Sequence, residues 1–172
     1  VPKPYIVYTG DVEKPVDCKV ATGLVEWTDY CVAQLVDTDK AFRFDNLPVI
    51  NTTEPFWSVG PPKRSTVVLA AFNLRKEFTY DDTAFVATLL GLGFNVLSCA
   101  HARLSDNKSL VRIATENHVQ IFDVRSLPVQ YPVGNGLKRS GFRLLTVGHD
   151  ANCGKKYTSL TLHRKLLEAG VK

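Results

Sequence analysis

The sequence predicts an α/β protein, with a parallel sheet followed near the C-terminus by a strand, a phosphate-binding type of loop and a helix. Two observations predict this fold class. Between residues 65 and 124, short apolar segments alternate with amphipathic helical segments, a pattern typical of parallel strands joined by right-handed crossovers. Further along, a Gly-Lys pair separates an apolar segment from a helical one, which is where phosphate-binding loops occur.

Before residue 65, two apolar segments predict strands. Tyr5–Tyr8 ends at a Thr-Gly pair, and Val32–Val36 lies in the segment DYCVAQLV. Residues 37–64 are rich in Pro, Asn, Asp and Thr, so we expect irregular structure there, with a turn at residues 59–64 (VGPPKR).

From residue 65 the pattern becomes regular. Buried strands are predicted at Ser65–Phe72, Asn95–Cys99 and Val119–Val124. A helix at Tyr80–Gly93 has acids in its first turn and a terminal glycine. A second helix at Ser105–His118 is expected to be capped by Ser105 or Asp106. We therefore expect the three strands to be parallel and adjacent, or nearly so.

The stretch from Arg125 to Gly141 contains two Pro and three Gly without periodicity, which favours a linker. We expect a first domain over residues 1–127, a linker over 128–141 and the start of a second, incomplete α/β domain over 142–172. In this last part the sequence predicts a strand at Arg143–Val147 and a helix at Lys155–Ala169, which a glycine ends.

Composition narrows the class of protein. The apolar fraction is 45%, which is ordinary for a globular protein. A membrane-spanning helix needs about eighteen or more consecutive apolar residues, and no stretch approaches this length. The N-terminal VPKPYIVYTG shows no secretory signal, and its lack of Met indicates processing or trimming. The four cysteines form no CxxC pair, so we expect reduced thiols in a cytoplasmic protein and no bound metal.

Positive charge gathers around the candidate loop. Residues 138–172 contain eight Lys or Arg and two acids, whereas the other 137 residues carry thirteen basic and fifteen acidic side chains. This distribution favours an anionic small molecule as the ligand. No basic face is interleaved with aromatic residues and no nucleic-acid motif is present, so we expect neither nucleic acid nor a membrane as a partner.

The candidate loop lies in TVGHDANCGKKYTS. A phosphate loop needs glycines that turn backbone N–H groups inward, a helix N-terminus and a lysine, and Gly148, Gly154 and Lys155 supply them. The common pattern has four residues between the glycines and a hydroxyl residue directly after the lysine. Here five residues intervene, Lys156 follows the lysine and Thr158 is the next hydroxyl, which weakens the case for Mg-ATP hydrolysis. An ordinary glycine turn between strand and helix is the alternative.

Several segments resemble known families. The spacing Gly148-x-Asp150-x-x-x-Gly154-Lys155 resembles the variant loop of dethiobiotin synthetase-like P-loop proteins. The whole chain resembles the D-glutamate N-acetyltransferase family, through DCKVATGLVEWTDYCVAQL, GFNVLSCAHARLSD, VQIFDVR and YPVGNGLKRSGFRLLTVGHDANCGKKYTSLTLHRKL. The Gly-Lys-Lys-Tyr-Thr run is the most specific piece. Two departures are Gly-His-Asp-Ala in place of the family's Gly-Thr-Asp-Cys, and NLRKEF in place of a glycine-rich turn.

This resemblance implies a Rossmann-like N-terminal domain followed by the start of a P-loop NTPase-like domain, in a protein longer than this chain. It implies transfer of an acetyl group from acetyl-CoA to an acidic amino acid such as D-glutamate. We also expect a homo-oligomer. Two other functions stay open: an ATP-dependent enzyme of the dethiobiotin synthetase type, using ATP and Mg²⁺, and a non-catalytic nucleotide-binding or assembly module.

The candidate ligand-binding residues follow from the loop and from the strand ends. In the loop they are Gly148, Asp150, Gly154, Lys155, Lys156 and Thr158. Asp150 is expected to order the loop, with a metal-holding role as the alternative. A lysine at a helix N-terminus opposes the helix dipole unless an anion is present, which favours a functional Lys155. His101 and Arg103 follow a predicted strand end and are candidates for substrate binding, with structural roles as the alternative. Asp123 and Arg125 are expected to pair locally.

The predicted strand Arg143–Val147 has no partner strand from its own domain, and an unpaired apolar strand is costly and prone to association. We therefore expect residues 142–172 to dock on the N-terminal sheet, to pair with a second copy, or to belong to a larger protein whose remainder lies outside this sequence. The last alternative is favoured because the resemblance to the longer family continues to Lys172.

Overall fold

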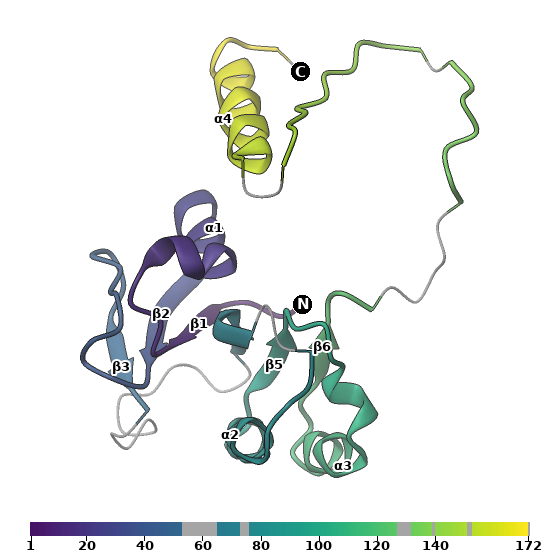
Figure 1. Ribbon diagram of the computed structural model, residues 1–172. Coiled ribbons are helices and arrows are strands. Elements are labelled where there is room, and N and C mark those ends of the chain that lie inside the picture. Colours follow the sequence, from purple (N-terminus) through teal and green to yellow (C-terminus); the bar gives the residue numbers. More distant parts are fainter. Residues whose placement is uncertain (53–64, 73–75, 127–131, 139, 151–152, 172) are drawn as a thin grey trace. The chain divides into compact units, whose positions relative to one another are not determined.

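The computed structural model describes residues 1–52, 65–72, 76–126, 132–138, 140–150 and 153–171 (Figure 1). The chain divides into two compact units, Val1–Gln130 and Tyr131–Lys172. The predicted turn at residues 59–64 and the first three residues of the segment NLRKEF lie outside the described residues.

The first unit is built on a six-stranded sheet in which every pair of neighbouring strands is parallel. Its strands are β1 (Tyr5–Gly10), β2 (Cys31–Val36), β3 (Val49–Asn51), β4 (Thr66–Leu69), β5 (Asn95–Ser98) and β6 (Ile121–Asp123). Their order is β3-β2-β1-β4-β5-β6, so the chain proceeds from β1 to one edge and then from β4 to the other. This is the doubly wound Rossmann-like order, and it confirms the predicted fold class and the adjacency of β4, β5 and β6.

Helices cover both faces of this sheet. They are α1 (Lys19–Trp27), α2 (Tyr80–Gly91) and α3 (Lys108–Glu116), with 3₁₀ turns η1 (Pro15–Asp17), η3 (Ala70–Phe72) and η4 (Leu104–Asp106). Successive strand residues alternate between the faces: Ile6 packs with α2 and α3, and Val7 packs with α1. Both side chains are fully buried, as expected for a parallel sheet covered on both sides.

Local signals explain where the helices begin. Thr79 and Asp82 form a reciprocal capping box at the start of α2, with N–H to side-chain oxygen distances of 2.9 and 3.1 Å. α3 begins at Lys108 and is capped by Asn107, whose Oδ1 accepts from Ser109 N and Leu110 N. The predicted cap at Ser105 or Asp106 is therefore wrong, because those residues form the preceding turn η4 instead.

The prediction from the sequence missed two elements and made a third, the strand β4, too long. Helix α1 and the short strand β3 were not predicted; β3 lies within the segment that we expected to be irregular. β4 ends at Leu69 rather than at Phe72, because the chain turns into η3 after the sheet edge. The length of a strand depends on where its neighbouring strands end, and a segment of β-branched residues does not show this by itself.

The second unit contains helix α4 (Lys155–Glu168), as predicted, but the predicted strand at Arg143–Val147 is wrong for this chain. Residues 142–148 form neither a strand nor a helix. Leu144, Leu145 and Val147 are 72%, 81% and 79% exposed. A strand is defined by hydrogen bonds to a neighbour, so an apolar sequence cannot form one without a partner.

Gln34 is a fully buried polar residue that fixes the loop between β2 and β3. Its Nε2 donates to Thr9 Oγ1 and to Phe42 O, each at 2.8 Å, and its Oε1 accepts from Phe44 N at 2.9 Å. One amide thus satisfies two backbone groups of a loop that has no regular secondary structure.

Replacing Gln34 by leucine is expected to lower the free energy of unfolding by about 3 kcal/mol, because the carbonyl of Phe42 and the N–H of Phe44 lose their partner. Chemical denaturation of the full-length protein measures this loss. The matched control is Val32→Thr on the same strand, where the side chain is 40% exposed and the change should stay within about 0.5 kcal/mol. Equal stability of the two variants would contradict the prediction.

Candidate functional site

The start of α4 has the backbone geometry of an anion-binding turn. Gly154 is its N-cap residue and has φ of 91°, in the left-handed region that favours glycine. Gly154 has no side chain that could cap the helix, so its presence leaves the first N–H groups of α4 open to an outside acceptor. Thr158 N donates to Gly154 O at 2.9 Å, which closes the first helical turn.

Lys155 folds back onto the loop. Its Nζ donates to the carbonyl of Asp150 and lies 3.3 Å from Cys153 Sγ. A Cβ at Gly148 would stand 2.2 Å from Cys153 Sγ and 3.3 Å from Lys155 Cγ, so only glycine fits there without displacing its neighbours. The structure therefore brings together Gly148, Asp150 and Lys155 of the predicted set, and adds Cys153 to them.

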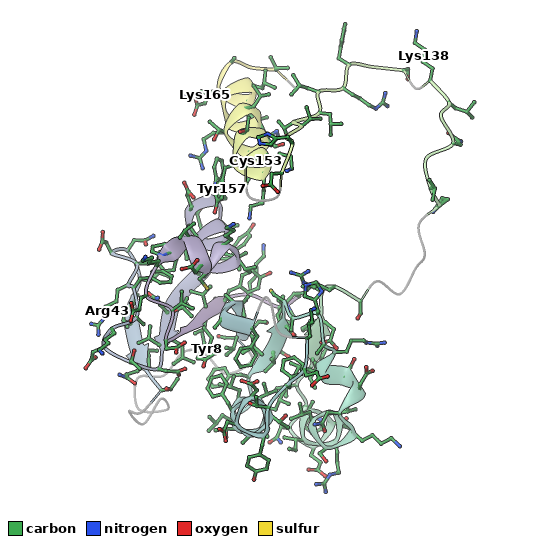
Figure 2. The ribbon with its side chains drawn as sticks, in the orientation of Figure 1. Tyr8, Arg43, Lys138, Cys153, Tyr157 and Lys165 are labelled. Atoms are coloured by element: carbon green, nitrogen blue, oxygen red, sulfur yellow. The ribbon has the colours of Figure 1, made fainter. Side chains whose placement is uncertain are left out.

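The other two predicted loop residues have different surroundings. Lys156 lies with its Nζ 5.1 Å from the ring centroid of Tyr157, and both belong to the first turn of α4. Figure 2 shows Tyr157 and Cys153 at this end of the helix. Thr158 is exposed. Lys156 is thus held close to the helix N-terminus, and within the described residues it forms no ion pair. Its charge adds to that of Lys155.

A pair of hydroxyl groups ties the segment before the loop to α4. Thr146 Oγ1 donates to Lys155 O at 3.0 Å and lies 2.8 Å from Ser159 Oγ. Because its single proton is used on the carbonyl, Thr146 must accept from Ser159. Sequence reasoning missed both roles. The only available signal was their placement at the two ends of the TVGHDANCGKKYTS segment.

The thiol of Cys153 lies in this positive environment. The backbone N–H of Asp150, then the hydrogen bond from the Lys155 ammonium and its charge, lower the pKa of Cys153 below its ordinary value. Burial instead raises the pKa of Cys18, Cys31 and Cys99 to about 11 each. All four cysteines are free thiols.

At the carboxyl ends of β5 and β6, the predicted substrate-binding residues have partners of their own. His101 Nε2 lies 3.2 Å from a guanidinium nitrogen of Arg125, whose Nε donates to Cys99 O at 2.7 Å. Arg103 directly precedes the turn η4, with its Nε 3.7 Å from Asp106 Oδ1. The structure thus places Arg125, rather than Arg103, next to His101.

The expected local pairing of Asp123 with Arg125 is not what the structure shows. Both Asp123 oxygens accept backbone N–H groups of η4, from Leu104 at 2.9 Å and from Ser105 at 3.0 Å. The carboxylate thus holds the turn that carries Arg103, since two charge-assisted hydrogen bonds fix it to the end of β6.

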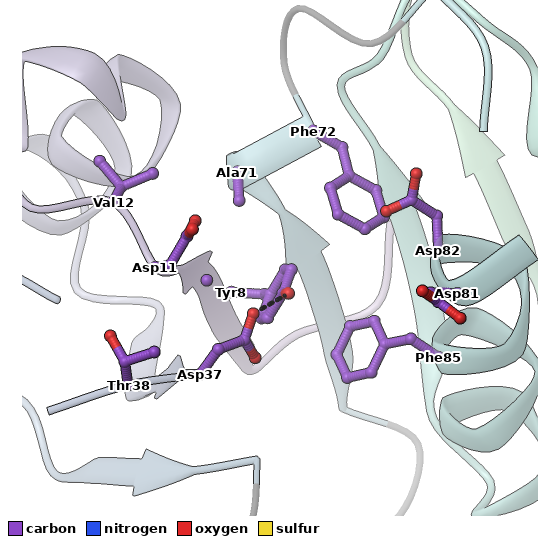
Figure 3. Close-up of a pocket in the computed structure, with 11 residues that line it drawn as sticks. Tyr8, Asp11, Val12, Asp37, Thr38, Ala71, Phe72, Asp81, Asp82 and Phe85 are labelled. Carbon is purple, nitrogen blue, oxygen red and sulfur yellow. Dashed lines mark hydrogen bonds between the residues drawn. The ribbon is translucent and has the colours of Figure 1, made fainter. Parts of the chain in front are cut away.

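A hollow lies at the carboxyl ends of β1, β2 and β4, where the strand order reverses (Figure 3). Its volume is about 440 Å³, within the range of small-molecule sites. It is lined by Tyr8, Gly10, Asp11, Val12, Asp37, Thr38, Ala71, Phe72, Asp81, Asp82 and Phe85. Sequence reasoning proposed none of these residues for ligand binding, although Asp11 and Asp37 directly follow strand ends.

Comparison with known families and proteins adds to this geometry. A family model described as a Rossmann-like domain of unknown function, DUF1611_N, matches residues 36–127. A second, described as the P-loop domain DUF1611_C, matches residues 132–172.

The chain belongs to the DUF1611 family.

Two curated proteins resemble this chain over nearly its whole length. A D-glutamate N-acetyltransferase of Tritonibacter scottomollicae is 30% identical over 98% of the chain and 50% of its own length. A D-glutamate N-acetyltransferase of a Pseudoalteromonas species is 27% identical over 98% of the chain and 49% of its own length. This DUF1611 chain therefore spans about half the length of the two relatives.

Two features are absent from the described residues of this DUF1611 chain. These residues contain no group of three or more His, Cys, Asp or Glu arranged to hold a metal ion. They also contain no helix with the length and apolarity needed to cross a bilayer.

Replacing Gly154 by alanine is expected to cost about 1 kcal/mol or more in the local stability of α4, because its φ of 91° disfavours any side chain. Hydrogen exchange of the α4 amides should therefore accelerate. The matched control is Gly91→Ala at the end of α2, where φ is not positive and a Cβ would meet nothing within 4 Å. Unchanged α4 exchange in Gly154→Ala would show that the described turn geometry is wrong.

Proposed function

We propose that the full-length protein is an N-acetyltransferase that moves the acetyl group of acetyl-CoA to the amino group of an acidic amino acid such as D-glutamate. The observation that carries the proposal is a glycine-started, doubly basic turn at α4, in a chain that matches two D-glutamate N-acetyltransferases over 98% of its length. We place this enzyme in the cytoplasm, where its four free thiols stay reduced.

The loop supplies the elements that a phosphate-bearing ligand needs. The N-terminus of α4 presents backbone N–H groups and the positive end of the helix dipole. Lys155 and Lys156 stand at this end without an acid in the first turn to balance them. In the proposal, the CoA diphosphate takes the place of the Asp150 carbonyl as the partner of Lys155 Nζ.

The proposed reaction forms a C–N bond between the neutral amine and the acetyl carbon, and breaks the C–S bond of the thioester. The amine loses one proton to a base, and the CoA thiolate leaves and takes up a proton. The acidic substrate needs cations for its carboxylates, and the carboxyl ends of β5 and β6 offer Arg103 and Arg125, with the imidazole of His101 beside Arg125 as a further polar group. A guanidinium can bind a carboxylate through two parallel hydrogen bonds.

The apolar segment before the loop is exposed in this chain, and we expect further parts of the protein to cover it. Leu144, Leu145 and Val147 would complete a strand if partner strands were available, either from the further length that the relatives have or from a second copy. We propose that the protein works as a homo-oligomer, and its mass by light scattering tests this.

A thermal-shift titration of the full-length protein separates acetyl-CoA from Mg-ATP as the ligand, since a ligand that binds the native state raises the melting temperature. Stabilisation by acetyl-CoA, together with release of free CoA in the presence of D-glutamate, is expected. Stabilisation by Mg-ATP alone, with phosphate release, would replace the proposal by an ATP-dependent enzyme. If neither acetyl-CoA nor Mg-ATP binds, the proposal is overturned, and a non-catalytic module is the remaining function.

A further inference from the structure

The hollow at the carboxyl ends of β1, β2 and β4 has an unusual charge for a site in a Rossmann-like sheet. Four carboxyl groups line it: Asp11, Asp37, Asp81 and Asp82. No Lys, Arg or His lines it among the described residues. A cleft whose charges share one sign concentrates ions of the opposite sign. A phosphate or a dicarboxylate would meet repulsion in this hollow.

The hollow is held open by the geometry of the strand ends. Gly10, the last residue of β1, has φ of 60°, and a Cβ there would lie 3.3 Å from Ala71 Cβ and 3.4 Å from Asp37 Oδ2. A side chain at position 10 would therefore crowd the residue that follows β2 and the turn η3 that follows β4. From here the chain proceeds in opposite directions after β1 and β4, which leaves the crevice that α/β proteins use for ligands.

Aromatic rings form a second part of the lining. The ring of Tyr8 lies 4.6 Å from that of Phe85 and 5.6 Å from that of Phe72, measured between centroids. Figure 3 shows these rings between Asp37 on one side and Asp81 and Asp82 of α2 on the other. Aromatic faces beside carboxylates favour organic cations, because ring quadrupole and charge both attract an ammonium group.

Tyr8 itself stays neutral. Burial first, then its hydrogen bond to Asp37 and the negative charges of Asp37, Asp11 and Asp82, raise the pKa of Tyr8 above its ordinary value. The phenol therefore keeps its proton and donates it to Asp37 Oδ2 at 2.6 Å, while Thr52 Oγ1 donates to Asp37 Oδ1 at 2.7 Å. Asp37 is thereby fixed in place, and each of its oxygens keeps a further lone pair for a ligand.

We propose that this hollow is a binding site for the ammonium group of a small organic amine. The rings of Tyr8 and Phe85 contact the methylene groups beside the nitrogen, and Asp11, Asp37 and Asp81 accept its N–H protons. This inference goes beyond acetyl transfer and does not depend on it, because it rests on the first unit alone. Its test uses binding rather than activity.

Isothermal titration of the full-length protein with 1,4-diaminobutane, 1,4-butanediol, adenosine and Mg²⁺ tests the chemistry of the site. The diamine is expected to bind, and the diol of the same length, which lacks the charge, is expected not to. Equal binding of the butanediol or of adenosine would show a hydroxyl site instead. Binding of Mg²⁺ in competition with the diamine would show an inorganic cation site. Either result overturns the proposal.

Variants then locate the site. Asp11→Asn and Asp81→Asn are each expected to raise the Kd of the diamine about fivefold or more, the scale of losing one charged contact. The matched control is Asp29→Asn, an exposed aspartate outside the hollow, with less than about a twofold effect. Melting temperatures confirm that each variant is folded, and Asp81→Asn keeps the capping box of α2 intact. An equal effect of Asp29→Asn, or no binding by the folded wild-type protein, would overturn the proposal.

Discussion

Replacing Lys155 by alanine in the full-length protein is expected to weaken binding of the phosphate-bearing ligand by about 2 kcal/mol or more, roughly thirtyfold in Kd. The reason is that the charged group of Lys155 turns onto the loop, where it meets the Asp150 carbonyl and Cys153 Sγ. Calorimetry with acetyl-CoA, and in parallel with Mg-ATP, measures the loss for whichever ligand binds.

The matched control is Lys165→Ala, which removes the same charge from the last turn of the same helix. Lys165 Nζ pairs only with exposed Glu168 in the described contacts, at 2.7 Å, and such a pair is worth little. Its loss should change Kd by less than about twofold. If both variants bind as the wild type does, the phosphate-loop interpretation is wrong. If both weaken binding equally, the effect is only that of net charge.

Alkylation by iodoacetamide at neutral pH is expected to occur at Cys153 and to spare the other three cysteines of the folded protein. The thiolate is the reacting form. Burial raises the pKa of Cys18, Cys31 and Cys99 to about 11, from 9.0, so each holds about a hundredfold less thiolate than an ordinary thiol. The pKa of Cys153 is instead lowered, and its side chain is exposed.

The sign of the pH dependence follows from these causes. The Asp150 N–H and the Lys155 ammonium favour the thiolate, so alkylation of Cys153 should begin at a lower pH than that of an unfolded-chain thiol. Lys155→Met removes the cation and should move the alkylation profile toward higher pH. Mass spectrometry of peptides from the wild type, Lys155→Met and Cys153→Ser measures it. Rapid labelling of buried Cys18 or Cys99, or an identical profile in Lys155→Met, would contradict the prediction.

The same pKa shifts affect stability. A buried thiol whose pKa is raised holds its proton more tightly in the folded state than in the unfolded state. Its contribution to stability is therefore complete below pH 9 and is lost as the pH rises from about 9 to about 11. Cys18 and Cys99 are both buried, so alkaline unfolding should begin in this window.

Local patterns determined much of this molecule from the sequence alone. The strands at β1, β2, β4, β5 and β6, the helix α2 and the helix α4 follow from apolar periodicity and from caps within a few residues. The parallel pairing of β4, β5 and β6 follows from helices between them that are long enough for a crossover. The glycines and lysines at the start of α4 were also predicted from the sequence, because they lie within a few residues of the helix N-terminus in the chain.

What only the tertiary structure decided depends on residues that are distant in the chain. The hollow joins Asp11, Asp37 and Asp81 because β1 lies between β2 and β4, and no local pattern shows that order. Arg125 meets His101 for the same reason, as the ends of β5 and β6 are neighbours. The segment Arg143–Val147 shows the converse. Its sequence favours a strand, yet a strand exists only when another backbone supplies the hydrogen-bonding partners that water otherwise provides.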